Sequence, residues 1–210
     1  MRLKNVKNAA TIIENSKYVI DNPTNYYGRW KETFGNKNII KIEIGMGKGD
    51  FIIENALTYP DVNFIGIEMF DSVMVRAVQK LNDKLIPNLR LIKMDASKID
   101  QVFNHEIDTI FLNFYDPWPK TRHSKRRLTS HVMLNQYNNT FKDKRTIIQK
   151  TDNINFFAFS ISSLSTYGYV LEKVTLDLHK EMPESNIMTE YEKRFFQEKK
   201  KICMLEAVKE

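Results

Sequence analysis

Short runs of β-branched and aromatic residues alternate with segments of helical spacing along most of the chain. The runs that read as buried strands stand at 38–45, 62–68, 88–96, 107–114 and 145–153. The helical segments stand at 50–60, 72–85, 130–141 and 154–168. Strands that alternate with helices need crossover connections, and these make the strands parallel. We therefore predict one α/β domain, closed by two further strands at 169–179 and 200–208.

The beginning of the chain stands outside this alternation. We expect residues 1–36 to form an N-terminal arm that is flexible or faces the substrate, and residues 37–210 to form the domain. A single cysteine, Cys203, is typical of a reducing compartment. No run approaches the roughly 18 apolar residues of a membrane helix, and the N-terminus lacks a signal-peptide core. We expect a cytoplasmic protein without a membrane segment.

A glycine-rich turn, EIGMGKGD, connects the first predicted strand to the first predicted helix. Its spacing is G-x-G-x-G, whereas dinucleotide-binding folds use G-x-G-x-x-G. Glu43 lies two residues before the first glycine, Gly45. A carboxylate there repels a phosphate but attracts a sulfonium or ammonium group, which favours S-adenosylmethionine over NAD. A tight strand–helix turn that binds nothing is the alternative.

Four carboxylates stand at the ends of four successive predicted strands: Glu43, Glu68, Asp95 and Asp116. Each one alone is readily explained as an exposed loop acid. The carboxyl ends of parallel strands, however, meet at one edge of the sheet, and open α/β sheets bind ligands at that edge. Glu68 is placed to accept hydrogen bonds from ribose hydroxyls, and Asp95 to meet an adenine amine.

A basic run follows the fourth carboxylate in NFYDPWPKTRHSKRRL. Residues 120–127 contain five cations and no acid, namely Lys120, Arg122, Lys125, Arg126 and Arg127. The whole chain carries +6, so the rest of it sums to about +1 (six minus five). A local excess of this kind favours a nucleic-acid partner, although a solvated surface is the alternative. The four histidines and Cys203 show no metal-ligand spacing, so we expect no metal.

These motifs together make the sequence similar to the bacterial tRNA (guanine(46)-N7)-methyltransferase family. The resemblance covers about residues 38–208, through IEIGMGKGDF, FIGIE, NFYDPWPKTRHSKRRL, KTDN, TLDLH and MTEYEKRF in that order. It implies a single Rossmann-like class I methyltransferase domain, with a mostly parallel sheet, helices on both faces and an antiparallel closing strand. It also implies methyl transfer from S-adenosyl-L-methionine to N7 of guanine 46 in the tRNA variable loop.

The resemblance assigns roles to the positions that match the family motifs. The cofactor-binding residues are then Glu43, Gly45, Gly47, Glu68, Asp95 and Asp116, and Asp116 is also catalytic. The substrate-binding residues are Lys120, Asp152, Thr189, Glu190, Tyr191 and Glu192. The residues that contact tRNA are Arg122, His123, Ser124, Lys125, Arg126 and Arg127. Tyr115 departs from the family, which has a small residue there, and the loops before the fifth and last strands lack the usual glycines.

The chemistry gives Asp116 a task that does not involve a strong base. Guanine N7 has an in-plane lone pair and is unprotonated at neutral pH, so the enzyme must mainly orient the reactants. Asp116 is suited to hold the guanine N1–H or N2 amine and to offset the charge gained on methylation. Pro117 and Pro119 restrict this turn, and Trp118 either stacks on a base or anchors the loop in the core.

Several alternatives stay open from the sequence. Thr189 and Glu192 also fit a helix capping box, and Asn153 can cap the helix that follows it. The chain could instead methylate a small molecule or a protein, which leaves the basic run without a role. A non-catalytic RNA-binding module on the same fold is a further alternative. The oligomeric state is expected to be a monomer or homodimer.

Overall fold

The computed structural model describes residues 6–181, 183 and 185–210. Within them a seven-stranded sheet has the order β3-β2-β1-β4-β5-β7-β6. β7 is antiparallel to both of its neighbours, and the pairs β1–β2, β2–β3, β1–β4 and β4–β5 are parallel. The strands are β1 Ile40–Ile44, β2 Asn63–Glu68, β3 Leu89–Lys93, β4 Ile107–Asn113, β5 Phe141–Thr151, β6 Val170–Thr175 and β7 Cys203–Lys209. The predicted fold class, with its antiparallel closing strand, is confirmed.

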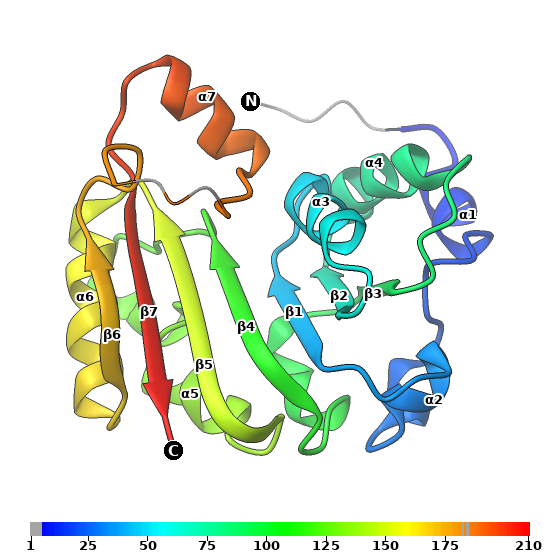
Figure 1. Cartoon of the computed structure of the whole chain (residues 1–210), viewed down its shortest axis with the longest axis horizontal. Helices are drawn as coiled ribbons and strands as arrows, with labels where there is room; N and C mark the ends of the chain where they lie inside the picture. Colours follow the sequence, from blue (N-terminus) through cyan, green and yellow to red (C-terminus); the bar gives the residue numbers. More distant parts are fainter. Residues whose placement is uncertain (1–5, 182, 184) are drawn as a thin grey trace.

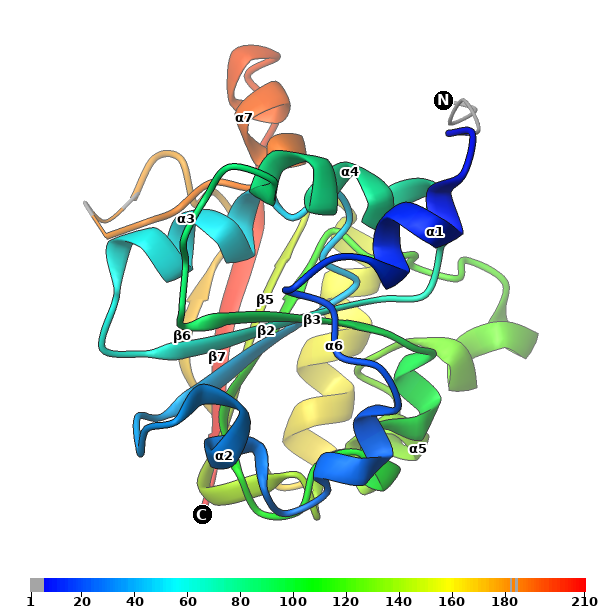
Figure 2. The ribbon, with the colours of Figure 1, turned by 90° about the vertical axis from the view of Figure 1, so that its right-hand side faces the viewer.

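Helices cover both faces of the sheet (Figure 1). The α-helices are α1 Ala9–Glu14, α2 Trp30–Phe34, α3 Asp50–Thr58, α4 Asp71–Leu81, α5 His131–Tyr137, α6 Ile154–Thr166 and α7 Glu190–Gln197. The 3₁₀ helices are η1 Pro23–Tyr26, η2 Ala96–Gln101 and η3 Thr121–Arg126. α3 and α4 lie on one face and α5 and α6 on the other, whereas α7 stands beyond the carboxyl ends of the strands (Figures 1 and 2). None of the described helices has the length and apolar character needed to cross a membrane.

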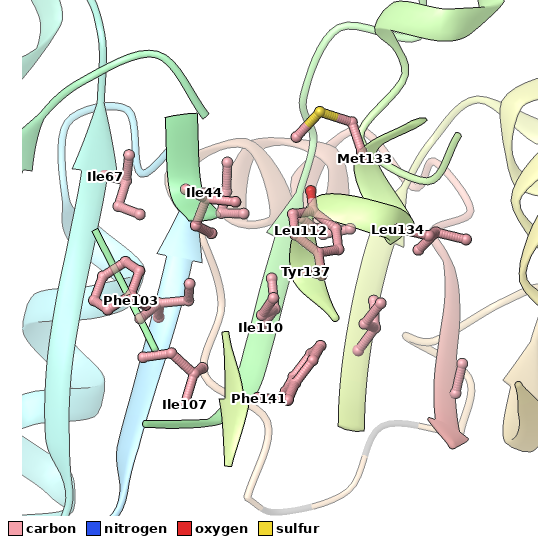
Figure 3. Packing of buried hydrophobic residues seen from close by; sticks show 14 of the residues in the cluster. Ile44, Ile67, Phe103, Ile107, Ile110, Leu112, Met133, Leu134, Tyr137 and Phe141 are labelled. Carbon is pink, nitrogen blue, oxygen red and sulfur yellow. The ribbon is translucent and has the colours of Figure 1, made fainter. Parts of the chain in front are cut away.

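The two apolar layers follow from the alternation of side chains along the strands. In β1, Ile42 and Ile44 face the α5–α6 side, where Phe103, Leu112 and Tyr137 complete a large cluster (Figure 3). Side chains from the intervening positions of the central strands face α3 and α4, where a second cluster forms. Because both faces of the central strands are covered, their sequences are almost continuously apolar. Glu43 belongs to an intervening position of β1, so this carboxylate lies on the α3 side.

The described part of the N-terminal segment packs against the domain. Ile13, Tyr18 and Trp30 are buried, and Trp30 Nε1 donates to the carbonyl of Val102 at 2.8 Å. Val19 also makes an isolated parallel bridge to Leu91 in β3. Residues 1–5 lie outside the described residues, and the division of the chain into an arm and a domain stays a prediction.

Several predicted boundaries differ from the structure, and the strand predicted over 169–179 ends at Thr175. α4 ends at Leu81 rather than at residue 85, and Leu85 is exposed. Leu81 already completes the buried stripe of this helix, and the residues after it (Asn82 and Asp83) are weak helix formers. The helix predicted over 130–141 ends at Tyr137, and β5 begins at residue 141 rather than 145 because its first residues pair beside β4.

We predict that Gly49 is required for packing as well as for backbone geometry. Gly49 and Gly35 both have positive φ, 78° and 67°, so Gly→Ala is strained at either site. A Cβ at Gly49 would lie 2.8 Å from Cβ of Ala77 in α4, whereas a Cβ at Gly35 would have no heavy atom within 4 Å. Gly49→Ala should therefore lower the free energy of unfolding by about 1–3 kcal/mol more than Gly35→Ala. Urea unfolding of both variants measures this difference, and equal values would contradict it.

Candidate functional site

Two cavities lie on the α3 side of the sheet. One, of about 280 Å³, has a mainly apolar lining that includes Phe51, Phe64 and Phe111. The other, of about 380 Å³, lies between the glycine turn and α7. The second is lined by Glu43, Gly45, Met46, Gly47, Lys48, Asp50, Phe51, Val73, Asn113, Phe114, Thr189, Glu190, Tyr191 and Arg194. It brings together six of the predicted site residues and is the candidate ligand pocket.

The glycine turn is fixed to the neighbouring strand. The amides of Gly45 and Met46 both donate to the carbonyl of Ile67 in β2, at 2.9 and 3.0 Å. Gly45 and Gly47 have φ values of 75° and 60°, in the left-handed region that favours glycine. A Cβ at Gly47 would meet nothing within 4 Å, so the backbone borders open space there. The turn therefore allows a ligand to approach the main chain closely.

Glu43 is a buried acid with one unpartnered oxygen. Its side chain is 2% exposed, and Oε1 accepts a hydrogen bond from Nδ2 of Asn113 in β4 at 2.9 Å. Glu43 Oε2 and Asn113 Oδ1 have no partner among the described residues, although both are buried and both residues line the pocket. Burial raises the pKa of Glu43 to about 8, although Asn113 and the charge of Lys150 lower it. Two orphaned acceptors in one pocket fit a ligand that brings N–H donors or positive charge.

Glu68 has a different environment at the end of β2. Its Oε2 accepts from the amide of Gly47 at 3.1 Å, and its Oε1 accepts from the amides of Met69 and Phe70 at 2.9 and 3.0 Å. Burial raises the pKa of this carboxyl, and the three amides oppose that effect. The side chain therefore holds the glycine turn in shape. Its lone pairs that are not used by these amides are still available to a ligand.

The three predicted aspartates are exposed loop residues at the carboxyl ends of their strands. Asp95 caps η2, because its Oδ1 accepts from the amide of Ser97 at 2.8 Å. Asp116 Oδ1 accepts from the amide of Trp118 at 2.9 Å, which leaves Oδ2 free of this turn. Asp152 follows Thr151, the last residue of β5. None of the three lines the pocket, and their roles as ligands stay predictions.

In the D-P-W-P turn, the side chain of Trp118 packs against basic residues of η3 and not against the apolar core. Trp118 is half-buried, with the guanidinium of Arg126 4.9 Å from its ring centroid and the ring of His123 at 5.7 Å. The alternative that this tryptophan anchors the loop in the core is wrong, because its half-buried ring belongs to none of the buried apolar clusters of the described residues. Tyr115 packs edge-on against Phe156 of α6, away from the pocket lining, and burial raises the pKa of its phenol.

The basic run divides into two kinds of residue. Arg127 donates from Nε to the carbonyl of Pro117 at 3.0 Å and from a terminal nitrogen to that of Trp118 at 3.1 Å. Its guanidinium also lies 4.3 Å from the ring centroid of Phe159 in α6, so it fixes the turn. The exposed cations of the run are Lys120, Arg122, Lys125 and Arg126, with His123 and Ser124 half-buried between them.

The start of α7 forms the wall opposite the glycine turn. Thr189 caps this helix, because its Oγ1 accepts from the amide of Glu192 at 3.0 Å. Glu190 makes an ion pair with Lys48 of the glycine turn at 2.6 Å, and Tyr191 stacks on Phe114 with ring centroids 6.2 Å apart. Glu192 is fully buried and points away from the pocket lining. The capping interpretation of Thr189 is thus confirmed, as is the capping of α6 by Asn153, whose Oδ1 accepts from Phe156 at 2.9 Å.

Sequence reasoning did not select eight of the residues that line the pocket, among them Lys48, Asn113, Phe114 and Arg194. Asn113 and Phe114 lie inside the quoted motif, directly before Tyr115, and their position at the end of a predicted strand was the available signal. Lys48 lies within the glycine turn. Arg194 lies in the quoted motif MTEYEKRF, two residues after the predicted substrate-binding residue Glu192. Among the described residues no three His, Cys, Asp or Glu side chains form a group that could hold a metal ion.

Comparison with known proteins gives concordant results. Residues 37–205 match a family model described as "Putative methyltransferase". A tRNA (guanine-N(7)-)-methyltransferase of Bacillus licheniformis is 48% identical over 197 residues, which cover 93% of this chain and 92% of the relative. The tRNA (guanine-N(7)-)-methyltransferase of Lysinibacillus sphaericus is 46% identical over 210 residues, 99% and 97% of the two chains.

Solved structures share the fold at low sequence identity. A 16S rRNA methyltransferase, KamB, has a TM-score of 0.66 with 12% identity, over 86% of this chain and 92% of the other. An antibiotic-related methyltransferase also has a TM-score of 0.66, with 17% identity, over 90% and 95% of the two chains. These similarities establish a class I methyltransferase fold.

We predict that Glu43 destabilises the ligand-free protein at alkaline pH. Its pKa rises from 4.5 to about 8 on folding, so the folded state binds more protons than the unfolded state between these values. The free energy of unfolding should therefore fall as the pH rises from about 4.5 to about 8. Glu43→Gln should remove this decline and be more stable than the parent above pH 8, by about 2–4 kcal/mol.

Urea unfolding from pH 5 to about pH 9 measures this effect. Glu54→Gln, on the exposed side of α3, is the matched control and should leave the pH profile of the parent unchanged. If Glu43→Gln follows the parent's profile at every pH, this carboxyl does not limit stability.

Proposed function

The chain belongs to the tRNA (guanine-N7)-methyltransferase family, and we propose that it transfers the methyl group of S-adenosylmethionine to N7 of guanine 46 in tRNA. The observation that supports this most directly is the pair of orphaned acceptors on Glu43 and Asn113. They lie in a pocket with the glycine turn on one side and the Thr189–Tyr191 segment on the other. The basic turn extends from the same edge of the sheet.

The cofactor is proposed to bind in the cavity beside the glycine turn. S-adenosylmethionine supplies an electrophilic methyl group on a sulfonium, together with an ammonium group. Glu43 Oε2 and Asn113 Oδ1 suit such cationic donors, because they are buried acceptors without partners. Gly45 and Gly47 allow the close approach, and Glu68, Asp95 and Asp116 are proposed to complete the site. A cation beside Glu43 favours its ionised form, so we expect cofactor binding to strengthen as the pH rises towards 8.

Asp116 is proposed to orient the guanine. Guanine N7 is already a nucleophile at neutral pH, so the protein's contribution is mainly to hold the base in line. One oxygen of Asp116 is used by the amide of Trp118, and the other can accept from the base edge. The same carboxylate offsets the positive charge that the purine gains. Lys120, Asp152 and the segment Thr189–Tyr191 are proposed to surround the substrate.

The exposed cations of the basic run are proposed to contact tRNA phosphates. Phosphate contacts fix the position and much of the affinity of a nucleic acid, whereas base contacts select the sequence. Lys120, Arg122, Lys125 and Arg126 are free for this role by their exposure. Arg127 is instead committed to the carbonyls of Pro117 and Trp118, so it is proposed to support the turn from behind.

Methyl transfer to unmodified tRNA tests the proposed function directly. The protein, S-adenosylmethionine and a tRNA transcript with guanine at position 46 should yield 7-methylguanosine, identified after digestion to nucleosides. A transcript with adenine at position 46 is the matched control and should yield none. Product from the control transcript would contradict the proposed position. Cofactor binding without transfer to any tRNA would favour a small-molecule or protein methyltransferase, and the absence of cofactor binding would favour a non-catalytic RNA-binding module.

We predict that the charge of Asp116 is needed for turnover. Asp116→Ala should bind cofactor and tRNA yet methylate at least about 100-fold more slowly, roughly 3 kcal/mol of transition-state stabilisation. Asp116→Asn keeps an acceptor for the Trp118 amide, so it preserves the turn while it removes the charge. Single-turnover rates with saturating tRNA distinguish the two effects. If Asp116→Asn is as fast as the parent, the residue only shapes the turn.

We predict that Arg122 and Lys125 neutralise phosphates. Replacing both by alanine should reduce the slope of log K against log[salt] for tRNA binding by about one to two units. It should weaken cognate and non-cognate tRNA alike, because phosphates carry no sequence. Lys31→Ala with Lys37→Ala removes two exposed cations near α2, at the amino edge of the sheet, and is the matched control. If the Arg122/Lys125 variant keeps the parent's slope, these cations are only a solvated surface.

A further inference from the structure

A row of buried polar side chains crosses the sheet on its α3 side, beneath the candidate pocket. Glu43 in β1 accepts from Asn113 in β4, and Asn113 is paired in register with Lys150 in β5. Lys150 in turn makes an ion pair with Glu192 of α7 at 2.9 Å. The exposed fractions of the Lys150 and Glu192 side chains are 6% and 0%. The row therefore consists of two bonded pairs, Glu43–Asn113 and Lys150–Glu192, which lie on neighbouring strands and extend from the glycine turn to the opposite wall of the pocket.

The ammonium group of Lys150 is fully used by the segment that enters α7. Its Nζ donates to Asn186 Oδ1 at 2.6 Å, to the carbonyl of Ile187 at 2.9 Å and to Glu192 Oε2 at 2.9 Å. Asn186 Nδ2 donates to the other oxygen of Glu192 at 2.8 Å, which closes the network. An ammonium group has three protons, and all three are directed to this one segment. Burial lowers the pKa of Lys150, and Glu192 opposes that effect.

Stability alone gives a poor account of this ion pair. Two buried charges lose more in desolvation than they gain unless hydrogen bonds satisfy them, and apolar pairs of similar size are often as stable. A buried pair does, however, oppose displacement of the segments it joins, because a displacement that separates the charges leaves each of them buried and uncompensated. In the structure, the bonds of Lys150 hold residues 186–192 next to the carboxyl end of β5.

The other contacts between this segment and the pocket rim are weaker. Lys48 and Glu190 form an ion pair whose side chains are 31% and 49% exposed, and such pairs contribute little. Tyr191 stacks on Phe114, but it is itself 54% exposed. Phe195 adds a buried apolar contact of α7 with Leu178 and Ile202. The interaction between Lys150 and Glu192 is thus the buried polar connection between the sheet and the segment that carries Thr189, Glu190 and Tyr191.

We propose that Lys150 is a positioning residue for the substrate wall of the pocket, and that Glu192 acts as its anchor rather than contacting guanine. This inference rests on the proposed function, in which Thr189–Tyr191 meet the substrate. It changes the role of Glu192, which the sequence resemblance groups with the substrate-binding residues. It also assigns a function to Lys150, which sequence reasoning treated only as part of a strand.

Four variants test this role: Lys150→Met, Glu192→Met, the double variant Lys150→Met/Glu192→Met, and Lys144→Met as the matched control. Lys144 is also on β5 and pairs with Glu172 at 3.0 Å, but both side chains are exposed. The single variants each leave one buried charge without its partner, whereas the double variant removes both charges together. It therefore provides a folded protein for the test even if a single variant does not fold.

The first readout needs no activity. Amide hydrogen exchange of residues 186–193 should accelerate by at least about 10-fold in Lys150→Met and in the double variant, and be unchanged in Lys144→Met. If the exchange of residues 186–193 stays at the parent's rate in both variants, the proposal is wrong, whatever the enzyme methylates.

The second readout is the kinetics of tRNA methylation. Lys150→Met and Glu192→Met should each raise KM for tRNA at least about 10-fold, and the double variant should be no worse than either, because the two residues act through one contact. If Glu192 touches guanine itself, its replacement will raise KM further in the Lys150→Met background, and the anchoring role fails. A fall in melting temperature with an unchanged KM would make the pair purely structural and also overturn the proposal. If the parent methylates no tRNA, the proposed function fails and the exchange data still decide the role of Lys150.

Discussion

The parallel pairing of β1 with β2 and β4 is the constraint on which the candidate site depends. Parallel strands bring their carboxyl ends to one edge, so the residues that follow them converge even when they are far apart in the chain. Glu43 and Asn113 are 70 positions apart and nevertheless share a hydrogen bond at the floor of the pocket. The glycine turn depends on the same pairing, because its amides are bound to Ile67 at the end of β2.

The burial of Glu43 illustrates how a binding site can oppose stability. A carboxyl that is 2% exposed and has one unpartnered oxygen is an unfavourable element of the ligand-free fold. Its raised pKa expresses this cost, since the fold favours the neutral form. A cationic ligand reverses that preference, because it supplies the charge and the donors that the protein does not. The same environment that destabilises the acid therefore suits it to the positive group of the proposed cofactor.

The turn around Asp116 separates tasks that a linear motif presents together. Arg127 and Arg126 are adjacent in the chain, but one donates to two backbone carbonyls and the other stacks on Trp118 while exposed to solvent. The turn can hold a carboxylate at a fixed place because its backbone is tied from behind by Arg127. The cations on its outer side are then available to a partner. A count of charges in the run could not have distinguished these two roles.

The sequence by itself determined the order of strands and helices, the glycine turn, the set of acids at the strand ends and the family resemblance. These features are local, because hydrophobic period and turn residues act over a few positions. It did not determine that β7 inserts between β5 and β6, because antiparallel pairing depends on which edge is left open. Nor did it determine that Lys150 pairs with Glu192, because these two residues lie 42 positions apart in the chain. A buried lysine or glutamate can bind substrate or fix the position of a neighbouring segment. Which of these it does depends on whether an oppositely charged side chain of the protein lies beside it, and only the tertiary structure decides that.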